Sequence, residues 1–267
     1  MISMPLIDVR SLCFSYREKN VLSDISFSIQ SSETWSIIGP NGAGKSTLIK
    51  CIAGLAKPQS GIVLINGTDI AKINPRDRAK TISYVPQASN RNLAAYSVFD
   101  FVMLGRFPYQ GLMAVSTSGD IEIVTDALKL TDVYDLRDRL LTSLSGGELQ
   151  RVFLAGAVAQ QSKILLLDEP STFLDPLHQL LVSKTLERIH KEFGTVIITI
   201  THDVNAAITR FSNVLALVDK KMFYAGSAAI FRERCPKILT DVFGIVFGEA
   251  TVKNASRVVM ICDEATP

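Results

Sequence analysis

Apolar and polar residues alternate in the first part of the chain. Ile25, Phe27 and Ile29 fall on one side, and Ser26 and Ser28 on the other, which is the pattern of a half-buried β-strand. Residues 6–14 show a similar pattern. Short apolar segments predict further strands at residues 35–38, 61–65, 82–85, 164–167, 195–201, 214–218 and 222–224. The uninterrupted apolar run at 164–167 is typical of a parallel strand buried on both faces.

A different spacing replaces this alternation between about residues 88 and 162. Apolar residues recur there at intervals of three and four, and no strand pattern is found. This spacing predicts helices at 98–104, 121–130 and 149–160, with a Gly/Ser/Thr-rich break at 116–119. Helices are also expected at 47–53 and 177–192, whereas the C-terminal residues predict only a short helix and a weak strand near 258–262. We therefore predict an α/β chain with a helical insertion.

The composition is that of a folded protein. Of the 267 residues 47% are apolar, and the formal net charge is only +2 without a polybasic segment, so nucleic acid is not an expected partner. The four cysteines lie far apart without a Cys-x-x-Cys pair, which is typical of reduced, structural thiols of the cytoplasm. No segment resembles a signal peptide or approaches the roughly 20 apolar residues that span a bilayer.

Residues 39–46 carry the clearest chemical signal, a glycine-rich loop between a predicted strand and a predicted helix. The glycines allow successive backbone N–H groups to turn towards an anion. Lys45 supplies a positive charge for the β- and γ-phosphates, and Ser46 supplies a hydroxyl for Mg²⁺. A glycine-rich turn without a ligand would not need both flanking elements. The pattern predicts a nucleoside-triphosphate site made of Gly39, Pro40, Asn41, Gly42, Ala43, Gly44, Lys45 and Ser46.

Two carboxylates directly follow the apolar strand at 164–167. Ligands bind at the carboxyl ends of the strands in open α/β sheets. Asp168 is therefore a candidate Mg²⁺ ligand, and Glu169 is a candidate base for the water that attacks the γ-phosphate. The alternative, a pair of solvated surface carboxylates, is disfavoured by the four aliphatic residues that precede them.

Three further residues lie where predicted strands end. Gln87 follows strand 82–85, where it is either a ligand of a metal or water or an ordinary loop residue. His202 follows strand 195–201, and contact with a γ-phosphate and a structural role fit the sequence equally well. Tyr16 is a candidate for stacking on a nucleotide base, although a core aromatic residue at a strand end is the simpler interpretation.

A second glycine-containing loop opens the predicted helix at 149–160. It reads Leu-Ser-Gly-Gly-Glu at 144–148, followed by Leu-Gln-Arg, and it forms a second helix N-terminus suited to an anion. A helix cap alone does not require two glycines followed by Glu-x-Gln-Arg. This run is the hallmark of ATP-binding cassette proteins. With both motifs present, the chain resembles the ATPase subunit of an ABC transporter over residues 6–226.

The resemblance implies a single ATPase domain with a P-loop NTPase fold of the ABC type. Its mixed, mainly parallel sheet would form a core at about 1–87 and 163–226, with an N-terminal antiparallel β subdomain, a helical subdomain at about 88–162 and a C-terminal extension at about 227–267. ATP and Mg²⁺ are the implied ligands. Residues 39–47, including Thr47, would hold the phosphates. The other implied roles are adenine stacking by Tyr16, sensing of Mg²⁺ and the attacking water by Gln87, proton removal by Glu169 and γ-phosphate contact by His202.

The resemblance also implies a homodimer. Ser145, Gly146 and Gly147 of one chain would cover the ATP bound by the phosphate loop of the other. Residues 171–175 match the loop that follows the catalytic glutamate, with Asp175 expected near the dimer axis. A lone chain then holds only half-sites. ATP would close the head-to-tail dimer, and hydrolysis would reopen it.

A cassette without a membrane span implies a separate permease. The segment 104–109, Leu-Gly-Arg-Phe-Pro-Tyr, resembles the Gly-Arg-x-Pro stretch of ATPases that serve iron-siderophore, haem and vitamin B12 importers, with a helix-ending loop as the alternative. We expect two integral-membrane permease subunits docked beside Gln87, an extracytoplasmic substrate-binding protein, and a location at the cytoplasmic face of the inner membrane. The cargo, haem, a ferric siderophore or a corrinoid, stays open because it contacts the permease and the binding protein.

Two other functions are alternatives to an importer. Soluble ABC ATPases of translation or DNA repair usually carry two cassettes or a long coiled-coil insert, and the sequence shows neither. A small-molecule kinase with a phosphate loop does not account for the run at 144–148 or for Asp168 and Glu169.

Overall fold

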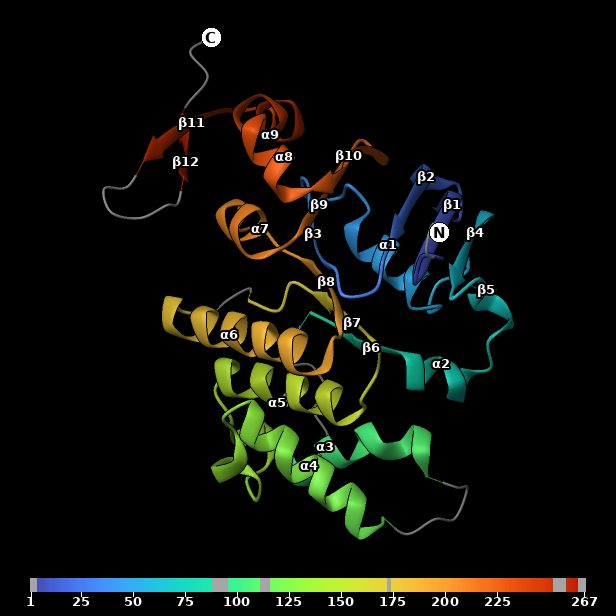
Figure 1. Cartoon of the computed structure of the whole chain (residues 1–267), viewed down its shortest axis with the longest axis vertical. Coiled ribbons are helices and arrows are strands. Elements are labelled where there is room, and N and C mark those ends of the chain that lie inside the picture. The colour runs from blue at the N-terminus through green and yellow to red at the C-terminus, as the bar shows by residue number, and fades with distance from the viewer. Residues whose placement is uncertain (1–3, 88–95, 111–115, 172–173, 252–257, 264–267) are drawn as a thin grey trace. The chain divides into compact units, whose positions relative to one another are not determined.

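The computed structural model describes residues 4–87, 96–110, 116–171, 174–251 and 258–263 (Figure 1). The chain divides into two compact units. The first unit comprises Met1–Lys72 and Ile198–Pro267, and the second comprises Ile73–Ile197. Strand β8 (Val196–Ile200) passes from the second unit into the first. The subdomain boundaries expected from the sequence, near 87 and 162, follow the pattern of the family and not the compactness of the two units. They stay a prediction.

An antiparallel sheet forms the N-terminal part of the first unit. Its strand order is β2-β1-β4-β5, and β1 pairs with β2 and with β4. Ile7 lies opposite Ile29 on one side and Ile65 on the other. The predicted alternation is confirmed, because alternate side chains along β1 are buried. The strand bounds are β1 (Ile7–Tyr16), β2 (Lys19–Ile29), β4 (Ser60–Ile65) and β5 (Thr68–Asp69).

A second group of strands in the first unit includes parallel pairs. Strand β3 pairs parallel with β9, with Trp35 opposite Asn213, and β9 pairs antiparallel with β10. Directly after β8, the Thr201 N–H donates to the Ile37 carbonyl at 3.2 Å. The bounds are β3 (Thr34–Ile38), β9 (Asn213–Val218) and β10 (Lys221–Ser227). The mixture of parallel and antiparallel strands expected from the sequence is confirmed.

Helices of the first unit bury its core. Ile38, Ile208, Val214, Phe231 and Leu239 belong to one hydrophobic cluster that joins β3 and β9 to three helices. Cys51 lies buried in this unit, and burial raises the pKa of its thiol to about 12. The helices are α1 (Lys45–Ile52), α7 (Val204–Arg210), α8 (Ala228–Glu233) and α9 (Cys235–Phe243), with a 3-10 turn at Ile70–Lys72.

The C-terminal residues are more regular than the sequence analysis predicted. Two helices, α8 and α9, are followed by an antiparallel hairpin of β11 (Val246–Thr251) and β12 (Val258–Asp263). The strand predicted near 258–262 is confirmed as β12, whereas the prediction of a single short helix was wrong and β11 was missed. Local signals were present, because Pro236 stands in the first turn of α9 and Gly244 ends it at a φ of 72°. The side chain of Cys262 lies outside the described part of the structure.

The second unit is built mainly of helices around a parallel strand pair. Strands β6 and β7 are parallel, with Val85 opposite Leu167. Val98, Val102, Val124 and Val152 belong to a cluster that joins α3, α4 and α5, of which α4 and α5 lie side by side (Figure 1). The elements are α2 (Pro75–Thr81), β6 (Ile82–Val85), α3 (Val98–Met103), α4 (Ser118–Leu130), α5 (Gly146–Ala159), β7 (Ile164–Asp168), α6 (Pro176–Phe193) and 3-10 turns at Leu104–Tyr109, Tyr134–Leu136 and Leu141–Ser143.

Helix α5 begins earlier than predicted. Its first residue is Gly146 and not Leu149, because Ser145 and Glu148 form a capping box. The Glu148 N–H donates to the Ser145 hydroxyl at 3.3 Å, and the Glu148 carboxylate accepts the Ser145 N–H at 2.7 Å. The Ser145 N–H and the Ser145 hydroxyl, which lies 2.8 Å from the same carboxylate, lower the pKa of Glu148. The two glycines expected in a loop therefore lie in the first turn of the helix.

The Gly-Arg-x-Pro segment forms a buried corner of the second unit. A Cβ atom at Gly105 would lie 2.4 Å from the Gly156 carbonyl oxygen, so only glycine allows this approach to α5. The Arg106 Nε donates to the Asp120 carboxylate at 2.9 Å, and the two side chains are 6% and 9% exposed. Arg106 also donates to the Ala159 carbonyl at 2.7 Å. The segment is a 3-10 turn anchored to α4 and α5, and not a plain loop that ends a helix.

Among the residues that the structure describes, no helix combines the length and the apolar character needed to cross a bilayer.

The Arg106–Asp120 pair predicts how the second unit responds to acid. Hydrogen bonds from Arg106 and from Thr117 lower the pKa of Asp120 from 3.8 to about 2. Because the folded-state pKa lies below the unfolded value, this stabilisation is complete above about pH 4 and is lost as the pH falls towards 2. We expect Asp120→Asn to lower the free energy of unfolding at pH 7 by about 2 kcal/mol and to weaken its dependence on pH in this window.

Denaturant unfolding of the full chain at several pH values measures this effect. Asp126→Asn is the matched control, because Asp126 lies on the same helix and is exposed. Equal losses of stability in the two variants would contradict a special role of the buried pair.

Candidate functional site

The phosphate loop of the first unit follows β3 and requires glycine at defined positions. Gly39, Gly42 and Gly44 have φ values of 145°, 82° and 100°, which favour glycine. A Cβ atom at Gly39 would lie 2.2 Å from the Leu217 carbonyl oxygen. Gly44 is the N-cap of α1, and as a glycine it offers no side chain to the N–H groups of the first turn. This geometry suits an anion at the start of α1.

Lys45 lies inside this loop with only 6% of its surface exposed. Its ammonium group donates to the carbonyl oxygens of Gly39, at 2.7 Å, and Pro40, at 3.0 Å. The loop therefore curls around the charge. Phosphate oxygens are stronger acceptors than carbonyls for an ammonium group, so the same position suits a phosphate ligand. Ser46 and Thr47 follow in the first turn of α1.

His202 and the phosphate loop follow neighbouring strand ends in the first unit. The Thr201 N–H donates to the Ile37 carbonyl, so the chain reaches His202 one residue after this contact, while β3 leads into Gly39 two residues later. His202 is exposed. Asp203, the next residue, caps α7 by accepting the Ala206 N–H at 2.9 Å.

Tyr16 ends β1 and is 52% exposed. Its ring packs edge-on against Phe14, with 4.8 Å between the centroids and an angle of 70° between the planes. The interpretation of Tyr16 as a core residue was therefore wrong. An exposed ring held by a neighbouring aromatic is suited to stacking.

In the second unit the parallel strands β6 and β7 bring three predicted residues to one end. Asp168 ends β7 and is 5% exposed, and Glu169 follows it. The Gln87 amide donates to the Glu169 carboxylate at 2.9 Å. Glu169 has a φ of 52°, a backbone conformation that costs a non-glycine residue about 1 kcal/mol or more. A strained glutamate at a strand end is a feature of functional sites.

Tyr84 is a residue of this end that sequence reasoning missed. Its hydroxyl donates to the Asp168 carboxylate at 3.3 Å from the neighbouring strand. Because Tyr84 lies on the apolar strand β6, its pattern indicated only a core position. A phenolic hydroxyl in a buried strand needs a polar partner, and this requirement could have indicated from the sequence that Tyr84 lies near a polar site.

The start of α5 contains the other glycine pair, and its two members differ. A Cβ atom at Gly146 would meet nothing within 4 Å, whereas one at Gly147 would lie 2.5 Å from the His178 ring. His178 belongs to α6, whose N-terminus is capped by Asp175. Sequence reasoning did not identify His178. Of the predicted segment 171–175, residues 172 and 173 lie outside the described structure.

Each unit by itself contains oxygen donors of the kind that Mg²⁺ binds. In the first unit Ser46 offers a hydroxyl, and in the second unit Asp168 offers a carboxylate and Gln87 an amide oxygen. Mg²⁺ prefers oxygen ligands and is usually held by one or two carboxylates together with substrate phosphates. The buried carboxylate of Asp168, oriented by the Tyr84 hydroxyl, is the chain's strongest candidate ligand.

An apolar groove lies beside Gln87 in the second unit. Its volume is about 500 Å³, and Tyr84, Val85 and Pro86, which lead into Gln87, form one side. The other lining residues come from α3, α5 and the turns near them and are Tyr96, Phe101, Leu104, Gly105, Leu141, Phe153, Gly156, Ala157 and Gln160.

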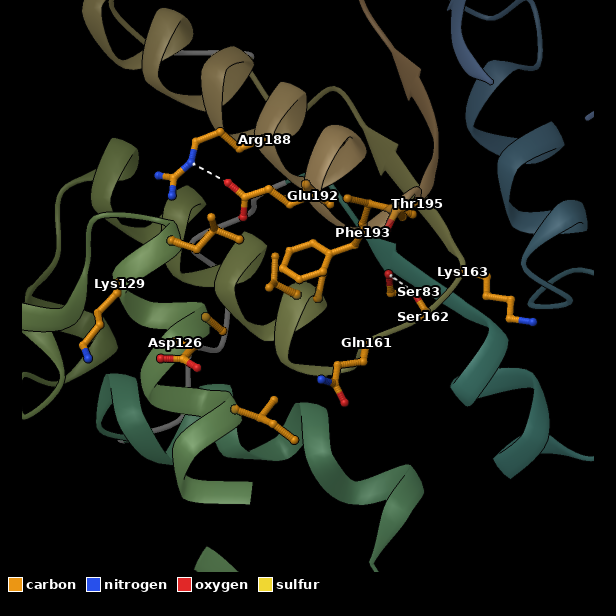
Figure 2. Close-up of a pocket in the computed structure, with 17 residues that line it drawn as sticks. Ser83, Asp126, Lys129, Gln161, Ser162, Lys163, Arg188, Glu192, Phe193 and Thr195 are labelled. Carbon is orange, nitrogen blue, oxygen red and sulfur yellow. Dashed lines mark hydrogen bonds and ion pairs between the residues drawn. The ribbon is translucent and has the colours of Figure 1, made fainter. Parts of the chain in front are cut away.

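A second cavity of about 560 Å³ lies at the opposite end of β7 (Figure 2). Leu165 and Thr195 line it, near the strand starts, and Figure 2 shows the Phe193 ring at its centre. Arg188 and Glu192 on its rim form an ion pair at 3.5 Å. No predicted site residue lies there, so this cavity is separate from Asp168 and Glu169.

Comparisons with known proteins place these features in a family. A family model described as ABC transporter matches residues 22–172. The petrobactin import ATP-binding protein FpuC of Bacillus anthracis is 36% identical over 90% of this chain and 87% of its own length. The iron(3+)-hydroxamate import ATP-binding protein FhuC of Bacillus subtilis is 35% identical over 91% of this chain and 89% of its own.

Two solved structures share the fold. One is a chain of a transporter described as a metal-chelate type ABC transporter in an inward-facing conformation. It has a TM-score of 0.84 at 26% identity, over 98% of this chain and 99% of that chain. The other is the ATP-binding cassette MJ0796, a dimer in a post-hydrolysis state with ADP and phosphate. It has a TM-score of 0.74 at 26% identity, over 83% of this chain and 98% of that chain.

The two glycines of α5 predict different responses to alanine. We expect Gly147→Ala to lower the free energy of unfolding by about 1–3 kcal/mol, because the methyl group collides with the His178 ring. Gly146→Ala is the matched control and should be neutral or stabilising by up to about 1 kcal/mol, because alanine favours the helix and its Cβ atom meets nothing. Chemical denaturation of both variants measures the difference. Equal stabilities would show that His178 does not lie against Gly147.

Proposed function

Because this chain belongs to the ABC transporter family of ATP-binding proteins, we propose that it is the ATP-hydrolysing subunit of an importer for an iron chelate. The relatives named above for import of petrobactin and of iron(3+)-hydroxamate support this class of cargo. The observation that carries the proposal is the hydrogen bond between Gln87 and Glu169 next to the apolar groove. Glu169 is the candidate base, and Gln87 directly follows Pro86, which lines the candidate docking groove.

In the proposed function, the residues of the phosphate loop and of the strand ends have separate roles in ATP binding and hydrolysis. Tyr16 stacks on the adenine, and residues 39–47 hold the phosphates through backbone N–H groups and Lys45. Ser46 and Asp168 would be ligands of Mg²⁺, which would supply positive charge to the phosphate oxygens. Glu169 accepts the proton of the attacking water, Gln87 orients that water, and His202 donates to the γ-phosphate.

The working form of the ATPase is a homodimer. Ser145, Gly146 and Gly147 of one chain cover the nucleotide in the phosphate loop of the partner, and Asp175 lies near the axis. The dimeric state of the similar cassette MJ0796 supports this arrangement. The glycine at 146, where a Cβ atom would meet nothing, leaves space for a ligand at the start of α5.

Two permease subunits dock in the groove beside Gln87, one on each ATPase chain. The groove is lined mainly by apolar and aromatic residues, which suits an amphipathic helix that lays its apolar face into it. An extracytoplasmic binding protein delivers the chelate to the permease, and the ATPase is held at the cytoplasmic face of the inner membrane. Neither of the two relatives favours the alternative, a soluble ABC protein of translation or DNA repair.

Removal of the candidate base tests the chemistry. We expect Glu169→Gln to slow ATP hydrolysis on the order of 100-fold or more, because the amide cannot take the proton of the water. ATP binding should survive, because the phosphate loop is unchanged. Phosphate release and the Kd for ATP measure the two effects. Glu187→Gln, an exposed change on α6, is the control that should hydrolyse ATP normally.

Reconstitution with the membrane partner tests the importer. The chain is co-purified with the permease encoded beside it, placed in lipid, and assayed with the binding protein loaded in turn with a ferric siderophore, haem and cobalamin. We expect the ferric siderophore to stimulate ATP hydrolysis most strongly. Stimulation by haem or cobalamin alone would correct the cargo, and a chain that responds to ribosomes or DNA but binds no permease would overturn the importer.

A further inference from the structure

Two segments that the proposed dimer would present to its partner meet at one side chain, His178. Asp175 caps α6, His178 lies in the first turn of that helix, and Gly147 lies in the first turn of α5. All three residues belong to the second unit. His178 is 28% exposed, so it is partly covered by these contacts.

The first contact fixes the carboxylate of Asp175. One carboxylate oxygen accepts the backbone N–H of His178 at 2.9 Å, and the other lies 2.8 Å from the His178 Nδ1. With Nδ1–H as the donor, both carboxylate oxygens are engaged by the same residue. The bond also helps to set the orientation of the imidazole ring, because it ties Nδ1 to the carboxylate.

The second contact fixes the start of α5. Three ring atoms of His178, Cδ2, Cγ and Nε2, lie 2.5, 2.8 and 3.0 Å from the position of a Cβ atom on Gly147. The ring therefore lies directly over the bare Cα atom of this glycine. Ser145 and Glu148 close the same helix turn through their capping box. The imidazole thus packs against a turn that the capping box already closes.

We propose that His178 is a positioning residue of the ATP-dependent dimer, which holds Asp175 and the 145–147 turn as one rigid surface for a second copy of this chain. It does so without contacting the nucleotide itself. The proposal rests on the dimer of the proposed function, but not on the importer or its cargo. The positioning role needs two parts of the His178 side chain. The Nδ1–H donates to Asp175, and the flat ring packs on Gly147.

Three substitutions separate the two contacts. His178→Ala removes both. His178→Phe keeps a flat ring over Gly147 but cannot donate to Asp175, and His178→Asn keeps an N–H donor near the place of Nδ1 but loses most of the ring. His190→Asn is the matched control, because His190 lies about three turns later on α6 and bonds the Thr195 carbonyl at 2.9 Å instead.

The experiment measures dimerisation of the full-length chain carrying Glu169→Gln, which should preserve the ATP-bound state, by sedimentation at increasing concentration with ATP and Mg²⁺. We expect His178→Ala to weaken the dimer by about tenfold or more, which corresponds to about 1.4 kcal/mol. His178→Phe and His178→Asn should each fall between the parent and His178→Ala. The ATP affinity of the single chain, measured at concentrations below dimerisation, should stay within about twofold for all of them.

The outcomes distinguish this role from a merely structural one. Weaker dimerisation with unchanged single-chain ATP affinity, and with a smaller effect in His190→Asn, supports the positioning role. An unchanged dimer affinity in His178→Ala overturns it, and so does an equal loss in His190→Asn. A parent chain that binds ATP yet stays monomeric overturns the proposed dimer and this role with it, whereas a parent that dimerises but engages no permease overturns only the importer.

Discussion

The loop between β3 and α1 follows its path only because two of its residues have no side chain. A Cβ atom on Gly39 would collide with the Leu217 carbonyl of β9, and one on Gly44 with Val21 and Leu22 of β2. Both groups of strands in the first unit therefore approach the same loop. The burial of β9 and the register of β3 against it set the position of the first N–H groups of this loop. The fold of this unit and its ligand site depend on the same close contacts.

The three helix starts that carry predicted nucleotide or dimer residues differ in how their N–H groups are satisfied. Helix α1 starts at a glycine without a side-chain cap, α5 is closed by Ser145 and Glu148, and α6 is closed by Asp175. An anion is the natural partner only where side chains have not already taken that place. Of these three starts, that of α1 leaves the place of a side-chain cap open, which suits the phosphates of the proposed function. The starts of α5 and α6 are closed by their own side chains, and in the proposed dimer they face the partner.

Local patterns were sufficient for much of this structure. The alternation in β1 and β2, the buried run before Asp168 and the glycine loop at 39–46 each depend on residues close in sequence, so they could be predicted. The contacts of Tyr84 with Asp168 and of His178 with Gly147 join separate segments, and no local spacing indicates them. The start of α5 was missed because two glycines were interpreted as loop residues, although the Ser-x-x-Glu pattern of a capping box was present.

The hydrogen bond between Gln87 and Glu169 bears on how much ATP the protein would hydrolyse without transport. In this arrangement the carboxylate that would take a proton from water already accepts the amide of Gln87. Gln87 directly follows Pro86, which lines the groove, so under the proposed function a permease segment in the groove would lie one residue away from this contact. Under the proposed function, this contact competes with the water for the carboxylate and would slow ATP hydrolysis for as long as it persists. The chain would then limit futile turnover by itself, without a separate inhibitor.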